Sequence, residues 1–245
     1  MVEPLFLKHF AAPPAQGETV VLDGDEGKHA ASVRRMRAGE AIALTNGLGL
    51  RVRGRVSVVE QKLLSILVDS IEQEEPAQLQ LTLVQALAKG DRDELAIQAA
   101  TELGIAAVVP WQADRSISRW DEAKAAKGQA RWQQICDEAA KQSLRCWFVR
   151  VEAPVSTKQL ASQISQFDRV LVLDPTASRG IASLGALTGR IAIVVGPEGG
   201  IDDAELESLA KAGAIRVRLG ASILRTSTAG IVAISALQAA SGQFD

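Results

Sequence analysis

Short apolar runs alternate with helical patterns from residue 79 to the end of the sequence. LQLTLVQAL, AAVVPW, FVRVEA, RVLVLD, IAIVVG and IRVRLG have the length and β-branched content of strands. Helical patterns occupy residues 91–104, 120–142, 157–166, 202–212 and 226–240. Apolar strands separated by helices are typical of a parallel sheet that is covered on both faces. The sequence therefore predicts an α/β domain with a largely parallel, buried sheet.

The first 72 residues follow a different pattern. ETVVLDG, EAIALTNG, LRVRGRVSVVE and LLSILVDSI are short β-branched runs separated by Gly, Asn and Asp turn signals. One short helix is expected between them, near residues 26–37. The polar stretch IEQEEPAQ has the composition of a linker. We therefore expect a small β domain over residues 1–72 and an α/β domain over residues 73–245.

Composition narrows the class of protein mainly by exclusion. The 27 Lys and Arg nearly balance the 29 Asp and Glu, for a formal net charge of -2, so charge has to be examined locally. MVEPLFLKHF has no basic segment followed by an apolar stretch, and no apolar run approaches the roughly 18 residues that span a bilayer. Cys136 and Cys146 lack metal-ligand spacing, and His9 and His29 lie far from them. We expect a cytoplasmic protein without a disulfide, a metal site or a membrane segment.

The pentapeptide GPEGG at residues 196–200, here called the glycine loop, turns the chain between an apolar run and a helix start. Ligands of open α/β sheets bind outside the carboxyl ends of the strands, where glycines let them approach the backbone. Asp202 and Glu205 have the spacing of a capping box for the next helix. The alternative is a tight turn and a helix cap with no ligand. The dinucleotide fingerprint G-x-G-x-x-G is absent, and NGLGL at 46–50 is expected to be a hairpin turn.

Two further strand ends share these features: LDPTA at 173–177 and LGASILRTSTAG at 219–230. Each is a loop rich in Gly, Pro or hydroxyl side chains that leaves an apolar strand. Three adjacent loops of this kind could surround an uncharged purine and its sugar with backbone groups and aliphatic side chains. A triphosphate would fit poorly, because no P-loop lysine is present.

These motifs resemble those of a known family. GPEGG-I-D-x-x-E, followed about twenty residues later by LG-x-x-x-LRT-x-TA, resembles the C-terminal signature of the RsmE family in the SPOUT superfamily of methyltransferases. The resemblance continues in KGDR at 89–92, ELG at 102–104, and the segments 110–116, 138–143 and 29–40. Enzymes of this family transfer a methyl group from S-adenosylmethionine to N3 of a uridine in 16S (small-subunit) ribosomal RNA.

The resemblance implies a SPOUT domain with a C-terminal trefoil knot, preceded by a small PUA-like β-barrel domain that binds RNA. The helix from Thr226 would then help to form a homodimer. Three positions depart from the family pattern: Ser227 replaces a common glutamate, Asp174 stands where histidine often precedes the proline, and Leu144 stands where glycine is usual. The cofactor would contact Leu173, Asp174, Pro175, Gly196, Glu198, Gly199, Gly200, Leu219, Gly220, Ile223, Leu224 and Thr226.

Methyl transfer from a sulfonium needs an in-line nucleophile and no metal ion, so positioning can supply much of the catalysis. The uracil N3–H must lose its proton, and a guanidinium beside the carbonyls would stabilise the developing negative charge. Arg225 is the first candidate because it follows the predicted cofactor wall; its alternative role is a structural clamp. Glu198 is the nearest candidate base, although a carboxylate in a glycine turn more often accepts backbone N–H groups. Arg115 could reach the target base or an RNA phosphate.

Basic residues gather in one part of the predicted β domain. Glu40 is the one carboxylate between residues 28 and 55, against Lys28, Arg34, Arg35, Arg37, Arg51, Arg53 and Arg55. Arg51, Arg53 and Arg55, here called the arginine row, alternate along a strand and share one face, where their repulsion favours an anionic partner such as RNA phosphate. Further candidates for phosphate contacts are Lys89, Arg92 and Arg115. The alternative is solvated charge. Aromatic residues make up only 4% of the chain, so base stacking would be minor.

The sequence thus predicts a dimeric enzyme that methylates a uridine of small-subunit ribosomal RNA with S-adenosylmethionine. Two other functions remain open. A SPOUT ribose 2′-O-methyltransferase would share the fold and the cofactor site. A non-catalytic RNA-binding homologue would share the fold alone.

Overall fold

A computed structural model describes residues 3–244 of the 245-residue chain. The chain forms two compact units. One contains the residues up to Pro76 together with Ala140–Phe148, and the other contains Ala77–Ala139 and the residues from Val149 onward. The expected division after residue 72 lies inside strand β5 (Leu63–Gln73), and the first unit continues past it. The return of residues 140–148 to this unit depends on tertiary contacts that no local pattern records.

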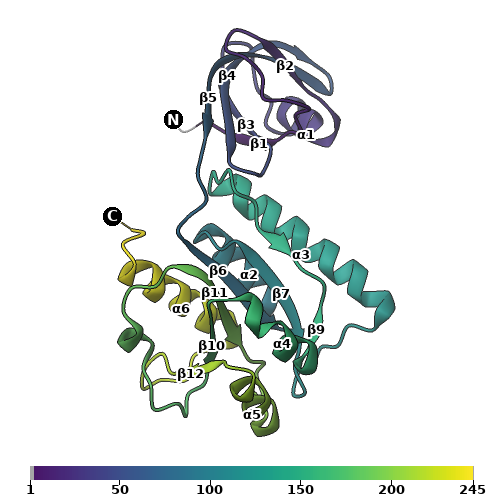
Figure 1. Cartoon of the computed structure of the whole chain (residues 1–245). Helices are drawn as coiled ribbons and strands as arrows, with labels where there is room; N and C mark the ends of the chain where they lie inside the picture. The colour runs from purple at the N-terminus through teal and green to yellow at the C-terminus, as the bar shows by residue number, and fades with distance from the viewer. Residues whose placement is uncertain (1–2, 245) are drawn as a thin grey trace. The chain divides into compact units, whose positions relative to one another are not determined.

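The first unit is built on a five-stranded sheet in the order β1-β3-β4-β5-β2. Antiparallel β3, β4 and β5 form a meander, and the sheet curls (Figure 1). The four strands expected from the β-branched runs are confirmed, whereas β1 is too short to show such a pattern and depends on its parallel pairing with β3. The strands other than β5 are β1 (Leu5–Leu7), β2 (Thr19–Leu22), β3 (Ala41–Thr45) and β4 (Leu50–Glu60).

The helix expected over residues 26–37 is shorter in the structure. Helix α1 (Gly24–Lys28) runs directly into a π-helix at His29–Val33. Arg35 has a φ of 55°, in the left-handed region, which a continuing right-handed helix excludes. The turn that follows leaves the Arg34, Arg35 and Arg37 side chains exposed, while Met36 is buried.

Residues 140–148 join the first unit through hydrogen bonds to its β3–β4 hairpin. The Gly49 amide donates to the Cys146 carbonyl at 2.9 Å, and Arg51 Nη2 donates to the Leu144 carbonyl, also at 2.9 Å. Leu144 has a φ of 57°. A residue with a Cβ is strained in this conformation, which explains why glycine suits this position in the family that the chain resembles.

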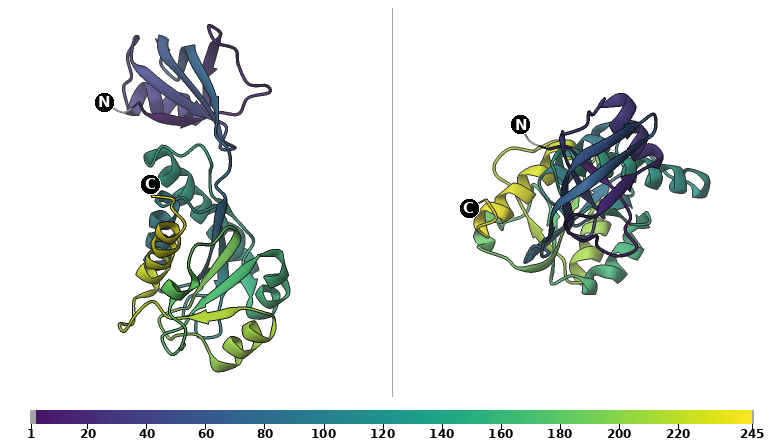
Figure 2. Two further views of the ribbon diagram at one scale, coloured as in Figure 1. Left: turned by 60° about the vertical axis from the view of Figure 1, so that its left-hand side comes forward. Right: turned by 90° about the horizontal axis from the view of Figure 1, so that it is seen from above.

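The second unit contains a parallel sheet in the order β12-β10-β11-β6-β7-β8, with β9 paired to β7. Helices cover both faces of the sheet (Figure 2), so the predicted α/β domain is confirmed. FVRVEA contributes only the two-residue β8, and β9 was not expected; both depend on pairing with β7. The strands are β6 (Leu79–Ala86), β7 (Ala107–Gln112), β8 (Arg150–Val151), β9 (Val155–Ser156), β10 (Arg169–Leu173), β11 (Gly189–Val195) and β12 (Ile215–Val217).

The helices of this unit divide between two hydrophobic cores. Leu83 and Val195 belong to the core under α2, α3 and α6, whereas their neighbours Val84 and Val194 belong to the core under α4 and α5. Adjacent residues of one strand thus face opposite sides of the sheet, which accounts for continuous apolar strands. The helices match the five predicted patterns: α2 (Arg92–Glu102), α3 (Glu122–Gln142), α4 (Thr157–Gln163), α5 (Asp203–Lys211) and α6 (Thr226–Ala240).

Candidate functional site

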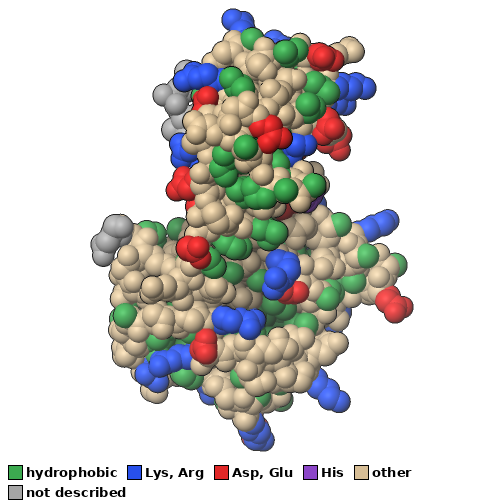
Figure 3. All heavy atoms as spheres, turned by 45° about the horizontal axis from the view of Figure 1, so that its top comes forward, with side chains coloured by type: hydrophobic (Ala, Val, Ile, Leu, Met, Phe, Trp, Pro, Cys, Tyr) green, Lys and Arg blue, Asp and Glu red, His purple; other side chains and the backbone are tan. Residues whose placement is uncertain are grey.

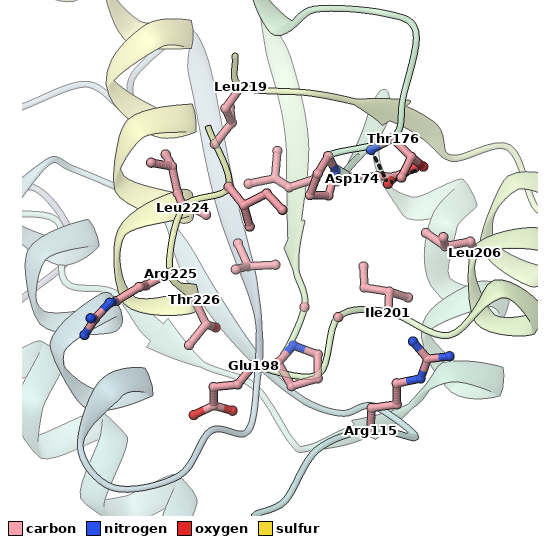
Figure 4. Close-up of a pocket in the computed structure, with 18 of the residues that line it drawn as sticks. Arg115, Asp174, Thr176, Glu198, Ile201, Leu206, Leu219, Leu224, Arg225 and Thr226 are labelled. Carbon is pink, nitrogen blue, oxygen red and sulfur yellow. Dashed lines mark hydrogen bonds between the residues drawn. The ribbon is translucent and has the colours of Figure 1, made fainter. Parts of the chain in front are cut away.

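A pocket of about 580 Å³ opens at the carboxyl ends of β10, β11 and β12 in the second unit. Strand β10 lies between the other two, so the three glycine-, proline- and hydroxyl-rich loops surround one cavity, as the sequence predicts (Figure 4). The predicted cofactor residues that line it are Leu173, Asp174, Pro175, Gly196, Glu198, Gly200, Leu219, Gly220, Ile223, Leu224 and Thr226. Gly199 is not among the lining residues; its carbonyl lies 3.4 Å from Arg115 Nη1.

Several lining residues were not anticipated. Ile201 is an apolar side chain just before α5, Leu206 lies in the first part of that helix, and Val195 ends β11. The amphipathic pattern of α5 could have indicated Leu206, since one face of this helix must meet the sheet. With Leu219 and Leu224, these residues give the cavity largely aliphatic walls.

The glycine loop needs glycine at two positions for different reasons. Gly200 has a φ of 73°, in the left-handed region, so a branched side chain there would strain the backbone itself. A Cβ at Gly196 would lie 2.6 Å from Ile201 Cγ1, a contact that requires the Ile201 side chain to move. The predicted capping box follows the loop: Asp202 accepts from the Ala204 amide at 3.0 Å, and Glu205 accepts from the Asp202 amide at 3.2 Å.

Glu198 accepts hydrogen bonds in the structure. Its carboxylate accepts from the Lys89 amide at 3.1 Å and from Arg92 Nη1 at 2.7 Å. Burial tends to raise the pKa of Glu198, but hydrogen bonds from its own amide, from Arg92 and from the Lys89 amide lower it below the usual value. A carboxylate held ionised in this way is a weak proton acceptor, so the geometry favours the structural alternative over the base.

Arg115 holds the other end of the same loop. Its Nη2 pairs with Asp202 Oδ2 at 2.7 Å. Together with the Arg92–Glu198 pair, this contact fixes the segment 196–202 from both sides; we call the two ion pairs the loop clamp. Arg92 and Arg115, which were considered for RNA phosphates, therefore both have a carboxylate partner within the second unit.

Two buried carboxylates accept hydrogen bonds from the backbone next to the residues of the loop clamp. Asp93, 5% exposed, accepts from the Ala88 and Glu94 amides and so shapes the turn that presents Lys89. Burial raises the pKa of Asp93. Glu205, 3% exposed, accepts from the Asp114 amide at 3.0 Å and from the Thr157 hydroxyl, besides capping α5. Sequence reasoning recognised Glu205 only as a cap, because its other partners lie far away along the chain.

Asp174 has hydrogen-bond partners in its own loop and in β12. Its carboxylate accepts from the Thr176 amide at 2.9 Å and the Thr176 hydroxyl at 2.8 Å (Figure 4). It also accepts from Arg216 Nε at 2.5 Å. Burial tends to raise the pKa of Asp174, but the bonds from Thr176 and Arg216 outweigh it and lower that pKa. Asp174 therefore shapes this wall of the pocket as an ionised carboxylate.

Arg225 stands at the N-cap position of α6 and is exposed. Its side chain is directed away from the centre of the cavity (Figure 4). Within residues 3–244 its guanidinium has no hydrogen bond or ion pair. Three arginines line the pocket. Arg92 and Arg115 form the ion pairs of the loop clamp, so within the described chain Arg225 is the one whose guanidinium is free to bind a substrate.

The arginine row was interpreted as a set of unpaired cations that need an external anion, and the structure differs from this interpretation. Each member pairs with a carboxylate of its own unit: Arg51–Glu74 at 2.7 Å, Arg53–Glu3 at 2.9 Å and Arg55–Asp69 at 3.6 Å. The repulsion argument is therefore wrong, because the compensating carboxylates lie outside the stretch of sequence in which charges were counted. Arg51 also binds the Leu144 carbonyl, and its side chain is only 14% exposed.

The remaining basic residues of this unit are arranged differently. Lys28, Arg34, Arg35 and Arg37, here called the basic turn, are exposed and form no ion pair with the chain described here. Figure 3 shows basic side chains interspersed with acidic ones over the N-terminal unit, in the upper part of the view. Lys89, in the second unit, is also exposed.

Between residues 3 and 244, no helix is long and apolar enough to cross a membrane, and no group of three or more His, Cys, Asp or Glu could hold a metal ion. Cys136 and Cys146 are free and buried. Burial raises the pKa of each thiol to about 11.

The fold and the pocket define the class of protein. Residues 74–238 match the family model of the RNA methyltransferase domain, and residues 22–69 match that of the RNA methyltransferase PUA domain. The chain is thus an RNA methyltransferase with an N-terminal PUA-like domain. More narrowly, it belongs to the family of ribosomal RNA small subunit methyltransferase E, which confirms the RsmE resemblance.

Relatives match over nearly the whole chain. Ribosomal RNA small subunit methyltransferase E of Mycobacterium tuberculosis is 41% identical over 237 residues, 95% of this chain and 90% of the relative. The Bacillus subtilis protein of the same name is 33% identical over 91% of this chain and 90% of its own length. The crystal structure of the Neisseria gonorrhoeae member bound to S-adenosylmethionine is 30% identical, with a TM-score of 0.86 over 97% of this chain and 98% of that one.

Proposed function

We propose that this protein transfers the methyl group of S-adenosylmethionine to N3 of a specific uridine in 16S ribosomal RNA of the small subunit. The observation that carries the proposal is the single pocket formed by three loops at the carboxyl edge of the sheet. Its volume lies within the range of about 300–1,000 Å³ that small-molecule sites occupy. Aliphatic walls and glycine backbone suit an adenosine group, and a Neisseria relative with 30% identity has been solved with S-adenosylmethionine.

The residues of the pocket divide into two proposed roles. Arg92, Arg115 and Glu198 hold the glycine loop against the cofactor, so we assign them to positioning and withdraw Glu198 and Arg115 from catalysis. When bound, S-adenosylmethionine supplies an electrophilic methyl group. The S–CH3 bond breaks as the N3–C bond forms, which leaves a neutral thioether, and the N3–H proton passes to solvent water. Arg225 stabilises the negative charge on the uracil. Arg225 suits this role because it is the pocket arginine without a partner in the described chain.

We further propose that RNA phosphates bind the basic turn. Its four cations are exposed and unpaired within residues 3–244, and exposed Val33 lies among them. The adjoining π-helix is a feature often found at functional sites. Arg53 and Arg55 are secondary candidates, since their side chains are 46% and 64% exposed, and Lys89 is a further one. Arg51 is withdrawn, because its partners hold the segment 140–148.

A homodimer through α6 is also proposed. This 15-residue helix has no charged side chain, yet Thr228, Val232 and Ala239 on one of its sides are exposed. Such a helix is usually covered, and a second copy of the chain would cover it. Val232→Glu should convert the dimer to a monomer in light scattering; a monomeric natural chain would contradict the proposal. The trefoil knot and a cytoplasmic location remain predictions.

Small ribosomal subunits from a strain that lacks this gene are the test substrate. Purified protein and S-adenosylmethionine are added, and nucleosides from the digested RNA are identified by mass spectrometry. We expect 3-methyluridine. A ribose 2′-O-methylated nucleoside instead would favour the alternative methyltransferase, and intact RNA binding without any cofactor binding would favour a non-catalytic homologue.

A further inference from the structure

A buried glutamine lies beside the pocket without lining it. Gln85, near the carboxyl end of β6, has no exposed surface and lies between the fully buried Val84 and Ala86. Its Nε2 donates to the Ala86 carbonyl at 3.0 Å and to Thr226 Oγ1 at 2.8 Å. A backbone carbonyl can only accept, so the amide nitrogen, and not the amide oxygen, must occupy this position.

This contact determines what the Thr226 hydroxyl can do. Its oxygen accepts from Gln85, so its proton is left to donate. Within residues 3–244 no group accepts a hydrogen bond from it. Thr226 is the first residue of α6 and lines the pocket (Figure 4). The hydroxyl is therefore a donor held beside the cavity.

Close packing of α6 on the sheet makes the contact with Gln85 geometrically possible. Gly230 lies four residues after Thr226, on the same side of the helix. A Cβ at Gly230 would lie 3.0 Å from Leu83 Cδ1 and 3.3 Å from Val195 Cγ2. The missing side chain lets α6 approach β6 and β11, which brings Thr226 within reach of Gln85.

The amide also carries a cost in stability. Gln85 Oε1 is buried and has no hydrogen-bond partner within the described chain. A leucine of similar size would avoid this unsatisfied acceptor, so packing alone does not account for glutamine at this position. The contributions that remain are the hydrogen bonds to the Ala86 carbonyl and to Thr226, and only the second involves a residue that lines the pocket.

We infer that Gln85 is a positioning residue of the cofactor site. It orients the Thr226 hydroxyl to donate a hydrogen bond to an acceptor atom of bound S-adenosylmethionine, and it does not touch the cofactor itself. This inference rests on the proposed function. It adds a residue that the pocket lining does not include.

Calorimetric titration with S-adenosylmethionine tests the inference in Thr226→Val, Gln85→Leu and the double variant, with melting temperatures recorded for each. One lost hydrogen bond weakens binding about 2- to 12-fold, and we expect this for each single variant. Thr226→Ser, which keeps the hydroxyl, should bind like the natural chain. In the double variant, Gln85→Leu should cause no further loss, because its effect is transmitted through the missing hydroxyl.

Gln238 provides a matched control. It is also buried in this unit, donates to the Leu103 carbonyl at 2.5 Å and has an unsatisfied Oε1. Gln238→Leu should shift the melting temperature without changing cofactor affinity. Unchanged affinity in folded Gln85→Leu, or losses that add fully in the double variant, would overturn the inference. If the natural chain binds the cofactor but does not methylate small subunits, only the proposed function fails; if it does not bind the cofactor, both fail.

Discussion

The ion pair between Glu198 and Arg92 allows one substitution to separate the two roles considered for this carboxylate. Glu198→Gln keeps an oxygen that can accept from the Lys89 amide, but removes the charge that faces Arg92 at 2.7 Å. The two side chains are 22% and 43% exposed, so the pair is partly solvated. A charge-assisted bond of this kind contributes about 1–2 kcal/mol. Its loss from the glycine loop should weaken S-adenosylmethionine binding roughly 5- to 30-fold.

Calorimetry and single-turnover methyl transfer at saturating cofactor measure affinity and chemistry separately. If Glu198 has a positioning role, Glu198→Gln and Arg92→Ala should raise the dissociation constant for S-adenosylmethionine by similar factors. The double variant should have a dissociation constant no higher than that of either single variant. The single-turnover rate should change little. A general base would behave in the opposite way, with a rate loss of about 10²–10⁴-fold and unchanged affinity. That result in Glu198→Gln would refute the loop clamp.

The ion pair between Glu198 and Arg92 also predicts how cofactor affinity changes with pH. The folded chain lowers the pKa of Glu198. The stabilisation of the glycine loop by the ionised Glu198 carboxylate is therefore complete above the usual carboxyl pKa and is lost as the pH falls through the lowered value. The affinity of the natural chain should therefore decrease on acidification below about pH 4, where an unperturbed glutamate titrates. Glu198→Gln, which cannot titrate, should show a flatter profile over the same range.

Three further predictions concern the other arginines and the thiols. Arg225→Ala should reduce the single-turnover rate about 10²–10³-fold with cofactor affinity intact, and Arg225→Lys should restore part of it; a full rate in the folded alanine variant would exclude the catalytic role. Changing the three arginines of the basic turn to glutamine should reduce the slope of log K for RNA binding against log salt concentration by up to about 0.9 per lost duplex contact. Arg51→Gln should leave this slope unchanged and lower the melting temperature. The reverse pattern would assign RNA binding to the arginine row. With a pKa of about 11, Cys136 and Cys146 should resist iodoacetamide at pH 8 and react fully in guanidinium chloride; rapid native labelling would contradict their burial.

Local patterns predicted the elements that depend on local physics. Continuous β-branched runs and helical periods located most strands and all five helices of the second unit, because side-chain direction within an element follows from its own repeat. The glycine loop was predicted to lie at a ligand-binding edge because strands of a parallel sheet present their carboxyl ends at one edge, and in the structure it lines the pocket. The capping box of Asp202 and Glu205 was predicted for the same local reason, since its partners lie three residues apart.

Partners that are distant in sequence required the tertiary structure. Charges counted between residues 28 and 55 suggested an unpaired arginine row, but Glu74 lies 23 residues beyond Arg51 and still neutralises it. The clamp joins Arg92 to Glu198 across 106 residues and Arg115 to Asp202 across 87. Gln85 reaches Thr226 across 141 residues. An ion pair or hydrogen bond depends on separations of about 3–4 Å, and only the folded chain brings such residues that close. The sequence by itself therefore determined most of the elements and the edge of the sheet at which the pocket opens, while the fold decided which charged side chains around that pocket are already paired.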